Sequence, residues 1–157
     1  ATGLELLFLG GINLTVDGEA VDINQRLTYK GMMIEGVPNL AFAVGYTNAS
    51  WTLKCDLTCD AIARLLDEMR NRSITSATPQ SEGAGVTAEP LLGLSAGYVQ
   101  RGVDRLPLQG SKAPWRVRQS YVADYRAMKL EPVLDEGLWP TYGRAGWGDK
   151  TKELEHL

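Results

Sequence analysis

The sequence predicts a mixed α/β fold in which a β-hairpin and a buried strand lead into a long helix, followed by a C-terminal helical extension. Three observations predict it. Asp17-Gly18 lies between two short apolar segments, consecutive apolar residues fill 40–44, and apolar residues recur at helical spacing over 51–71. The 157 residues are 44% hydrophobic and 22% charged, a composition typical of one globular domain.

The hairpin is expected from Leu14 to Ile23, because Asp17-Gly18 tolerates the positive φ angles of a tight turn. A further strand is expected over 27–34. Gly36-Val37-Pro38-Asn39 has turn chemistry, and the apolar run 40–44 that follows is typical of a strand covered on both faces.

A helix is expected from about Trp51 to Asn71, with a broad apolar stripe along one side. Acidic residues near its start and basic residues near its end suit the two ends of the helix dipole. The stripe consists of Leu53, Leu57, Ala61, Ile62, Leu65, Leu66 and Met69.

Three further segments follow the first unit, which covers 1–74. Residues 75–94 are rich in Ser, Thr, Pro and Gly without periodicity, and we expect a linker there. Residues 95–130 are expected to form the helical extension. Residues 131–157 show no assignable pattern and are expected to be an irregular tail, whose last residues resemble an expression-vector scar.

Two short helices are expected within the extension. The first has Ser95 as its cap and stops at Pro107, since proline cannot continue a helix. The second begins near Pro114 and Trp115, with apolar and aromatic residues at helical spacing up to Met128.

Charge and composition disfavour several function classes. Sixteen basic and nineteen acidic residues leave a net charge of −3, so no chain-wide attraction to nucleic acid or anionic membrane is indicated. The longest apolar stretch, Leu4 to Leu14, is too short and too interrupted to span a membrane. Two cysteines and no secretion signal favour a cytoplasmic location.

Cys55 and Cys59 lie one helical turn apart and could supply two metal ligands. A zinc site needs three or four ligands, and His156 near the end of the chain is the sole histidine. We therefore expect no metal site and interpret the cysteines as two buried, reduced thiols. For the same reason no Ser-His-Asp triad can be assembled.

The segment from Arg101 to Lys129 contains seven basic and two acidic residues, a local charge of +5. Interleaved Trp115, Tyr121 and Tyr125 make stacking on single-stranded nucleic acid conceivable. These aromatic residues coincide with the apolar stripe of the expected helix, so packing in the core is the preferred interpretation. The basic residues are then a solvated helix face or a surface that docks onto another part of a larger protein.

The junction between the strand 40–44 and the helix is the first candidate site. The carboxyl end of a buried strand that meets a helix N-terminus presents unpaired backbone N–H groups, and ligands bind at such junctions in open α/β sheets. Thr47, Asn48, Ser50 and Thr52 add polar side chains there. The alternative is that one or two of them cap the helix and the others are solvated.

No G-x-G-x-x-G follows an expected strand and opens a helix. Glu82-Gly83-Ala84-Gly85 lies inside the expected linker and lacks the third glycine. The chain therefore has no self-sufficient dinucleotide-binding fingerprint.

Several stretches between Ala1 and about Gly137 together resemble the C-terminal portion of bacterial FAD- and NADPH-dependent flavoprotein monooxygenases, of the flavin-containing and Baeyer-Villiger type. The long string over 45–54 is the most specific of them. The stretches are Ala1-Thr2-Gly3-Leu4, Lys30-Gly31-Met32-Met33, Val37-Pro38-Asn39-Leu40-Ala41-Phe42, Gly45-Tyr46-Thr47-Asn48-Ala49-Ser50-Trp51-Thr52-Leu53-Lys54, Ser95-Ala96-Gly97-Tyr98-Val99-Gln100-Arg101 and Gly110-Ser111-Lys112-Ala113-Pro114-Trp115-Arg116.

The resemblance implies that residues 1–74 are the C-terminal part of an FAD-binding domain. It implies that Thr2 and Gly3 lie near FAD, where the chain passes between the nicotinamide and flavin domains. It also implies that the loop 45–53 lies beside the flavin ring, with the backbone N–H groups of Thr52 and Leu53 facing a ring carbonyl oxygen.

The resemblance further implies a whole enzyme that uses FAD, NADPH and O2 to oxygenate small organic substrates, namely ketones, thioethers or amines. The catalytic groups and glycine-rich loops would precede Ala1, so the chain is expected to be a fragment, inactive alone, whose partner is the remainder of the flavoprotein. The competing hypothesis is a stand-alone binding or protein-interaction module with basic helices.

Overall fold

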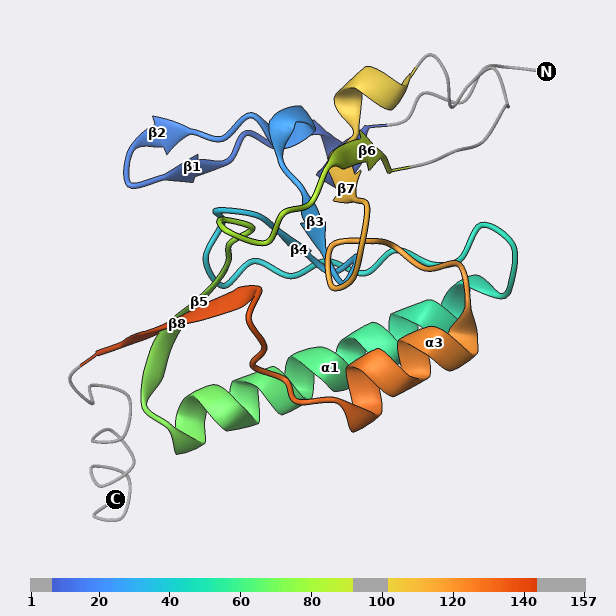
Figure 1. Cartoon of the computed structure of the whole chain (residues 1–157). Helices are drawn as coiled ribbons and strands as arrows, with labels where there is room; N and C mark the ends of the chain where they lie inside the picture. Colours follow the sequence, from blue (N-terminus) through green and yellow to red (C-terminus); the bar gives the residue numbers. More distant parts are fainter. Residues whose placement is uncertain (1–6, 92–101, 144–157) are drawn as a thin grey trace, which may run out of the picture.

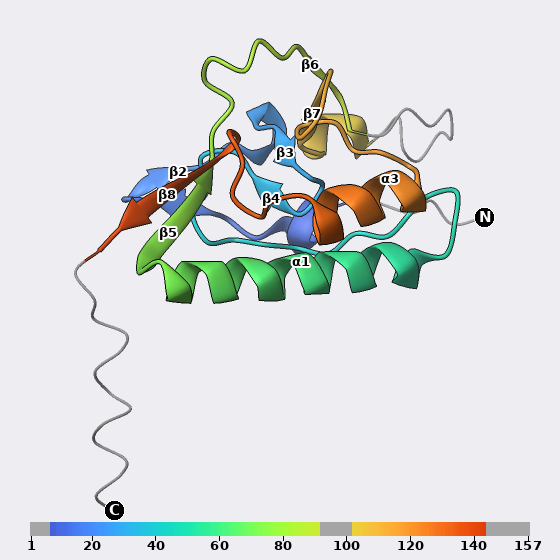
Figure 2. The ribbon, with the colours of Figure 1, turned by 60° about the horizontal axis from the view of Figure 1, so that its bottom comes forward.

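The computed structural model describes residues 7–91 and 102–143 of the chain. Within these residues the expected mixed α/β class is confirmed: a long helix and a short helix lie side by side, and four two-stranded antiparallel sheets lie to one side of them (Figures 1 and 2). The long helix is α1 (Trp51–Asn71), whose bounds agree with the expected ones, and the short helix is α3 (Tyr121–Tyr125).

The expected N-terminal hairpin is confirmed. A 3-10 turn, η1 (Phe8–Gly11), precedes β1 (Thr15–Val16), which pairs with β2 (Glu19–Ala20). The turn residues Asp17 and Gly18 have φ angles of 53° and 86°, as a tight primed turn requires.

The region expected as one strand over 27–34 is instead a second hairpin, which follows the 3-10 turn η2 (Ile23–Gln25). Its strands are β3 (Thr28–Tyr29) and β4 (Met33–Ile34), and all four residues are buried. The chain reverses because Lys30 and Gly31 adopt φ angles of 49° and 64°, which no continuous strand allows.

The segment expected as a linker and the segment expected as an irregular tail each contribute a strand to one sheet. Strand β5 (Ile74–Pro79) pairs with β8 (Leu138–Tyr142). Strand β6 (Ala88–Pro90) likewise pairs with β7 (Leu108–Gly110). Sequence periodicity missed these strands because each finds its partner far along the chain, and that pairing leaves little local pattern.

The extension over 95–130 differs from the expectation in the part that the structure describes. The predicted helix start at Ser95 lies outside the described residues, and a 3-10 turn, η3 (Val103–Arg105), lies before β7. The second helix begins at Tyr121 rather than near Pro114, and continues into a π-helical turn, η4 (Arg126–Leu130). Trp115 therefore precedes the helix instead of lying on it.

The expected buried strand over 40–44 is not formed. Ala41 makes an isolated bridge to Met33, whereas Ala43 and Val44 are exposed. The Phe42 N–H still donates to the Met32 carbonyl at 2.8 Å. Among the described residues no strand pairs with 43–44, so these two residues have no ladder to join and the segment enters α1 as an extended loop.

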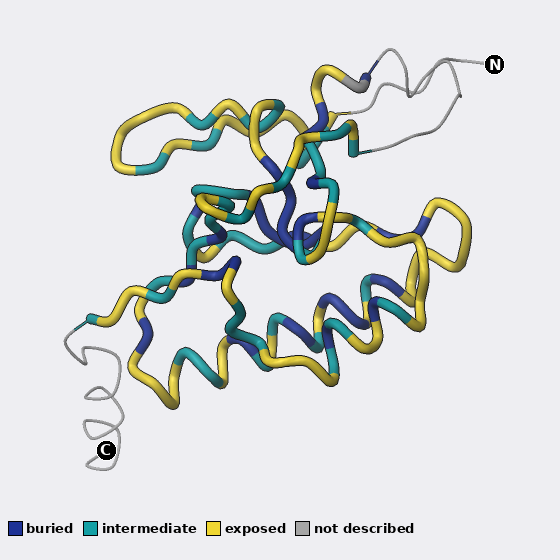
Figure 3. The backbone as a smooth tube through the Cα atoms, viewed as in Figure 1, coloured by how far each residue is buried: buried dark blue, intermediate teal, exposed yellow. Residues whose placement is uncertain are grey.

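The main core lies between α1 and the strands, where the buried side of α1 faces the sheets (Figure 3). Leu57, Ala61 and Leu65 of the expected stripe are buried. Leu53 and Leu66 are 42% and 55% exposed, because the covered face of the helix is narrower than its apolar stripe. The core consists of Leu27, Tyr29, Met32, Met33, Leu57, Ala61, Leu65, Ala77, Trp115, Met128 and Leu138.

Candidate functional site

Residues 45–53 comprise the loop that enters α1 and the first residues of the helix, and we call them the 45–53 loop. They lie beside the segment that leads into α3 (Figures 1 and 2). Residues 47–53 are exposed, whereas Gly45 and Tyr46 are buried. The fold therefore presents a polar, accessible rim above a buried base.

Gly45 forms part of this base and allows the chain to pass close to α1. A Cβ at this position would overlap the indole ring of Trp51 and would stand 2.6 Å from the Trp51 Cα. Because one of these neighbours is backbone, a side chain at residue 45 is excluded unless the loop moves away from the helix.

Tyr46 and Lys54 converge on one buried carboxylate, that of Asp124 in α3. The Tyr46 hydroxyl donates to Asp124 Oδ2 at 2.7 Å, and Lys54 Nζ lies 2.9 Å from the same oxygen. Burial raises the pKa of the Tyr46 hydroxyl, and the hydrogen bond to Asp124 raises it further. Burial lowers the pKa of the Lys54 ammonium, and its hydrogen bond to Asp124 partly opposes that change.

Thr47 and Asn48 are held by Gln119, which precedes α3. Thr47 donates to Gln119 Oε1 from both its backbone N–H, at 3.0 Å, and its hydroxyl, at 3.1 Å. Asn48 Nδ2 donates to the backbone carbonyl of Gln119 at 3.0 Å. The hydrogen bonds of these two predicted site residues therefore orient the loop.

Ser50 is the N-cap residue of α1, yet its side chain makes no capping hydrogen bond. The Ser50 and Thr52 hydroxyls instead lie 3.0 Å apart, and the first turn of α1 contains no acidic residue. The alternative in which the polar residues cap the helix is therefore wrong for Ser50. The backbone N–H groups at this helix start have no side-chain cap and can donate hydrogen bonds to an electronegative atom of a ligand.

Comparison with curated proteins shows which proteins this sequence resembles. The chain is 46% identical over 138 residues to the FAD-containing monooxygenase EthA of Mycobacterium tuberculosis, an alignment that covers 88% of this chain and 28% of that protein. It is 42% identical over 139 residues to the probable FAD-binding monooxygenase AlmA of Acinetobacter baylyi, with the same coverage. The chain is homologous to a segment of FAD-containing monooxygenases.

A third relative is the putative FAD-containing monooxygenase MymA of Mycobacterium tuberculosis, 44% identical over 139 residues. The chain spans 28% of the length of that protein as well. No protein-family model and no solved structure matches the chain. The resemblance to flavoprotein monooxygenases is thus confirmed by sequence relatives.

The other predicted cofactor-binding residues, Thr2 and Gly3, lie outside the described residues. Cys55 is half-buried and Cys59 is exposed, so the expectation of two buried thiols is wrong for Cys59. Within 7–91 and 102–143, no three His, Cys, Asp or Glu residues gather in a metal-binding arrangement.

Three basic residues of the extension pair with acidic ones. Arg116 lies 3.0 Å from Glu89, Arg126 lies 3.5 Å from Glu131, and Lys129 pairs with Asp60. These exposed pairs reduce the local positive field on which a nucleic-acid surface would depend. Over the described part of the chain, every helix is also too short or too polar to traverse a lipid bilayer.

The aromatic residues of the extension divide into two groups. Trp115 is 1% exposed and packs edge-on against Tyr29, with ring centroids 5.6 Å apart, so its predicted place in the core is confirmed. Tyr121 and Tyr125 are 40% and 39% exposed and contact each other, so their predicted burial is wrong. The short helix α3 turns Asp124, and not the tyrosines, toward α1.

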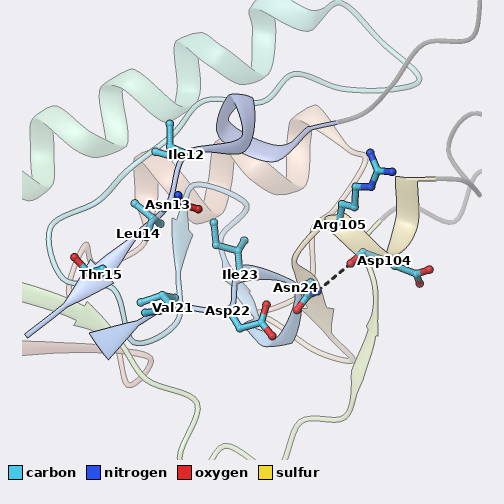
Figure 4. Close-up of a pocket in the computed structure, with 11 residues that line it drawn as sticks. Ile12, Asn13, Leu14, Thr15, Val21, Asp22, Ile23, Asn24, Asp104 and Arg105 are labelled. Atoms are coloured by element: carbon cyan, nitrogen blue, oxygen red, sulfur yellow. Dashed lines mark hydrogen bonds between the residues drawn. The ribbon is translucent and has the colours of Figure 1, made fainter. Parts of the chain in front are cut away.

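A separate hollow of about 330 Å³ lies between the N-terminal hairpin and η3 (Figure 4). At its rim Asn24 Nδ2 donates to the backbone carbonyl of Asp104 at 3.1 Å. The hollow includes no residue of the 45–53 loop. No sequence pattern indicated it, because its walls come from segments far apart in the chain.

Sequence reasoning also missed Gln119 and Asp124, the two residues that hold the 45–53 loop. One feature of the sequence could have indicated Asp124: it is an isolated carboxylate among aromatic and apolar neighbours in a basic segment. No feature of the sequence indicated Gln119, because its partners Thr47 and Asn48 lie far from it in the chain.

Proposed function

We propose that this chain is the C-terminal portion of an FAD-containing monooxygenase, in which the 45–53 loop lies beside the flavin ring. The observation that carries the proposal is the start of α1, where no side chain caps the helix and the polar residues of the loop are exposed. The names of the relatives, which describe FAD-containing or FAD-binding monooxygenases, support the same cofactor.

The residues present fit a flavin in three respects. The absence of a side chain at Gly45 keeps the loop close to α1, the N–H groups of the first turn have no capping side chain, and hydroxyls of Ser50 and Thr52 lie at the rim. In the proposal the N–H groups of Thr52 and Leu53 face a ring carbonyl oxygen. Their partial positive charge, added to the helix dipole, stabilises negative charge on that oxygen.

The whole enzyme is proposed to use FAD and NADPH, and the bound flavin supplies the activation of O2 that oxygenates a ketone, thioether or amine. This chain contains no G-x-G-x-x-G. We therefore propose that the remainder of the flavoprotein contains the catalytic groups and the loops that bind the cofactor phosphates. Thr2 and Gly3 are proposed as further FAD contacts. The proposed location is the cytoplasm. The residues of this chain orient the ring and exclude water from it.

Replacement of Ser50 by tryptophan in the full flavoprotein tests the proposal. Ser50 is exposed and caps nothing, so Ser50→Trp is expected to leave thermal unfolding of the apoprotein nearly unchanged while FAD affinity falls about tenfold or more, as an obstructed ring site requires. The matched control is Asn71→Trp, at an exposed position at the opposite end of the same helix. A Ser50→Trp protein with normal flavin content and reduced stability would contradict the proposal.

A further inference from the structure

The 45–53 loop has few attachments of its own to the rest of the molecule. In the described part of the chain, Thr47, Asn48 and Ala49 make no backbone–backbone hydrogen bond to another element. Residues 47–50 are exposed and belong to no strand or helix. The position of this loop, including the start of α1, must therefore depend on side chains from other parts of the chain.

Asp124 holds both ends of the segment 46–54. Tyr46 and Lys54 bind the same carboxylate oxygen, at 2.7 Å and 2.9 Å. The Lys54 and Asp124 side chains are 3% and 8% exposed, and Lys54 Nζ also lies 3.7 Å from the Met128 sulfur. Because Lys54 lies in the first turn of α1, this contact sets the position of the helix start as well as that of the loop.

Gln119 binds the middle of the segment 46–54. Its side-chain oxygen accepts two hydrogen bonds from Thr47, and its backbone carbonyl accepts one from Asn48. Gln119 itself is exposed, so these bonds contribute orientation and little burial.

A cluster of this composition is better suited to orientation than to stability. A buried ion pair costs desolvation that its attraction only partly returns, and apolar residues of similar volume often stabilise a fold more. Such pairs are instead able to select one geometry among several. Here the geometry selected is that of the exposed polar loop.

We propose that Gln119 and Asp124 fix the 45–53 loop in the orientation that receives the flavin. Gln119 and Asp124 are positioning residues: they act through Thr47, Tyr46 and Lys54 and not by contact with the cofactor. This inference rests on the proposed function of the loop. The inference adds Gln119 and Asp124 to the site as residues that need not contact the flavin.

Gln119→Ala in the full flavoprotein is the primary test, because Gln119 is exposed and its loss leaves the core intact. The expected result is an FAD dissociation constant raised about tenfold, with unchanged thermal unfolding of the apoprotein. A shift of the flavin midpoint potential to a more negative value is also expected, because misplaced N–H groups stabilise the negative charge of the reduced ring less well. Gln119→Glu keeps the acceptor oxygen and is expected to restore both values toward those of the parent.

Ser120→Ala is the matched control, since Ser120 is the exposed neighbour and its side chain caps nothing. The paired variant Lys54→Met with Asp124→Leu removes the buried charges together and is expected to weaken FAD binding even where folding is preserved. Unchanged FAD affinity and potential in Gln119→Ala would overturn the positioning role and leave the proposed function standing. A parent flavoprotein that retains no FAD would overturn the proposed function and this inference with it.

Discussion

Gly45 and Trp51 lie so close together that a Cβ on residue 45 would stand 2.6 Å from the Trp51 Cα and would overlap the indole ring. The contact joins the end of the extended segment to the first residue of α1. It explains why this connection into α1 requires glycine although no positive φ angle is involved.

Gly45→Ala is expected to destabilise the chain by about 1–3 kcal/mol, because the loop must move away from the backbone of α1. Urea denaturation of the purified chain measures the change in the free energy of unfolding. Ala49→Ser, an exposed substitution in the same loop, is the control and is expected to stay within about 0.5 kcal/mol of the parent. Equal stability of the parent and Gly45→Ala would show that the loop has room for a side chain.

Asp124→Asn is expected to destabilise the chain by about 3–5 kcal/mol, because it leaves the buried Lys54 ammonium without a counter-charge. Replacing Lys54 by methionine and Asp124 by leucine together is expected to cost much less, since no uncompensated charge remains. Denaturant unfolding of the two variants and the parent measures this difference. A double variant less stable than Asp124→Asn would show that the ion pair itself stabilises the fold.

Trp115→Ala is expected to cost about 3–5 kcal/mol, because the ring is 1% exposed and packs against Tyr29. Tyr121→Ala removes a side chain that is 40% exposed, and a cost below about 1 kcal/mol is expected. Thermal or urea unfolding of the two variants provides the comparison. Similar losses of stability in both would restore the interpretation that Tyr121 belongs to the core.

The stability of the chain is expected to fall above about pH 10 because of Tyr29 and Tyr46. Burial raises the pKa of both hydroxyls above their ordinary value of 10.0, so above that pH the unfolded chain releases protons that the folded chain retains. Each group then contributes a decline of up to about 1.4 kcal/mol per pH unit, whereas below pH 10 neither contributes a slope.

Urea denaturation at several pH values between about 8 and 11 measures this slope. Tyr29→Phe and Tyr46→Phe each remove one ionising group, and each is expected to flatten the decline. The exposed Tyr142→Phe is the control. A slope that neither buried variant changes would show that other groups cause the alkaline loss of stability.

The sequence by itself determined the elements that depend on near neighbours. The Asp17-Gly18 hairpin forms as expected because two adjacent residues can adopt the required positive φ angles without help from elsewhere. Helix α1 runs from Trp51 to Asn71 as expected, because its apolar residues repeat at the period of the helix itself. The strings around 45–54 were also sufficient to indicate the flavoprotein monooxygenases, a resemblance that the relatives confirm.

Tertiary structure decided everything that depends on partners distant in the chain. Strand β5 exists because β8 pairs with it, and 43–44 is no strand because none of the described strands pairs with it. The same holds for the candidate site: its polar residues could be named from the sequence, but the bonds from Gln119 and Asp124 that hold the loop join residues brought together by the fold. Local sequence records only the preferences of a segment, whereas burial and pairing are properties of the neighbours that segment finally meets.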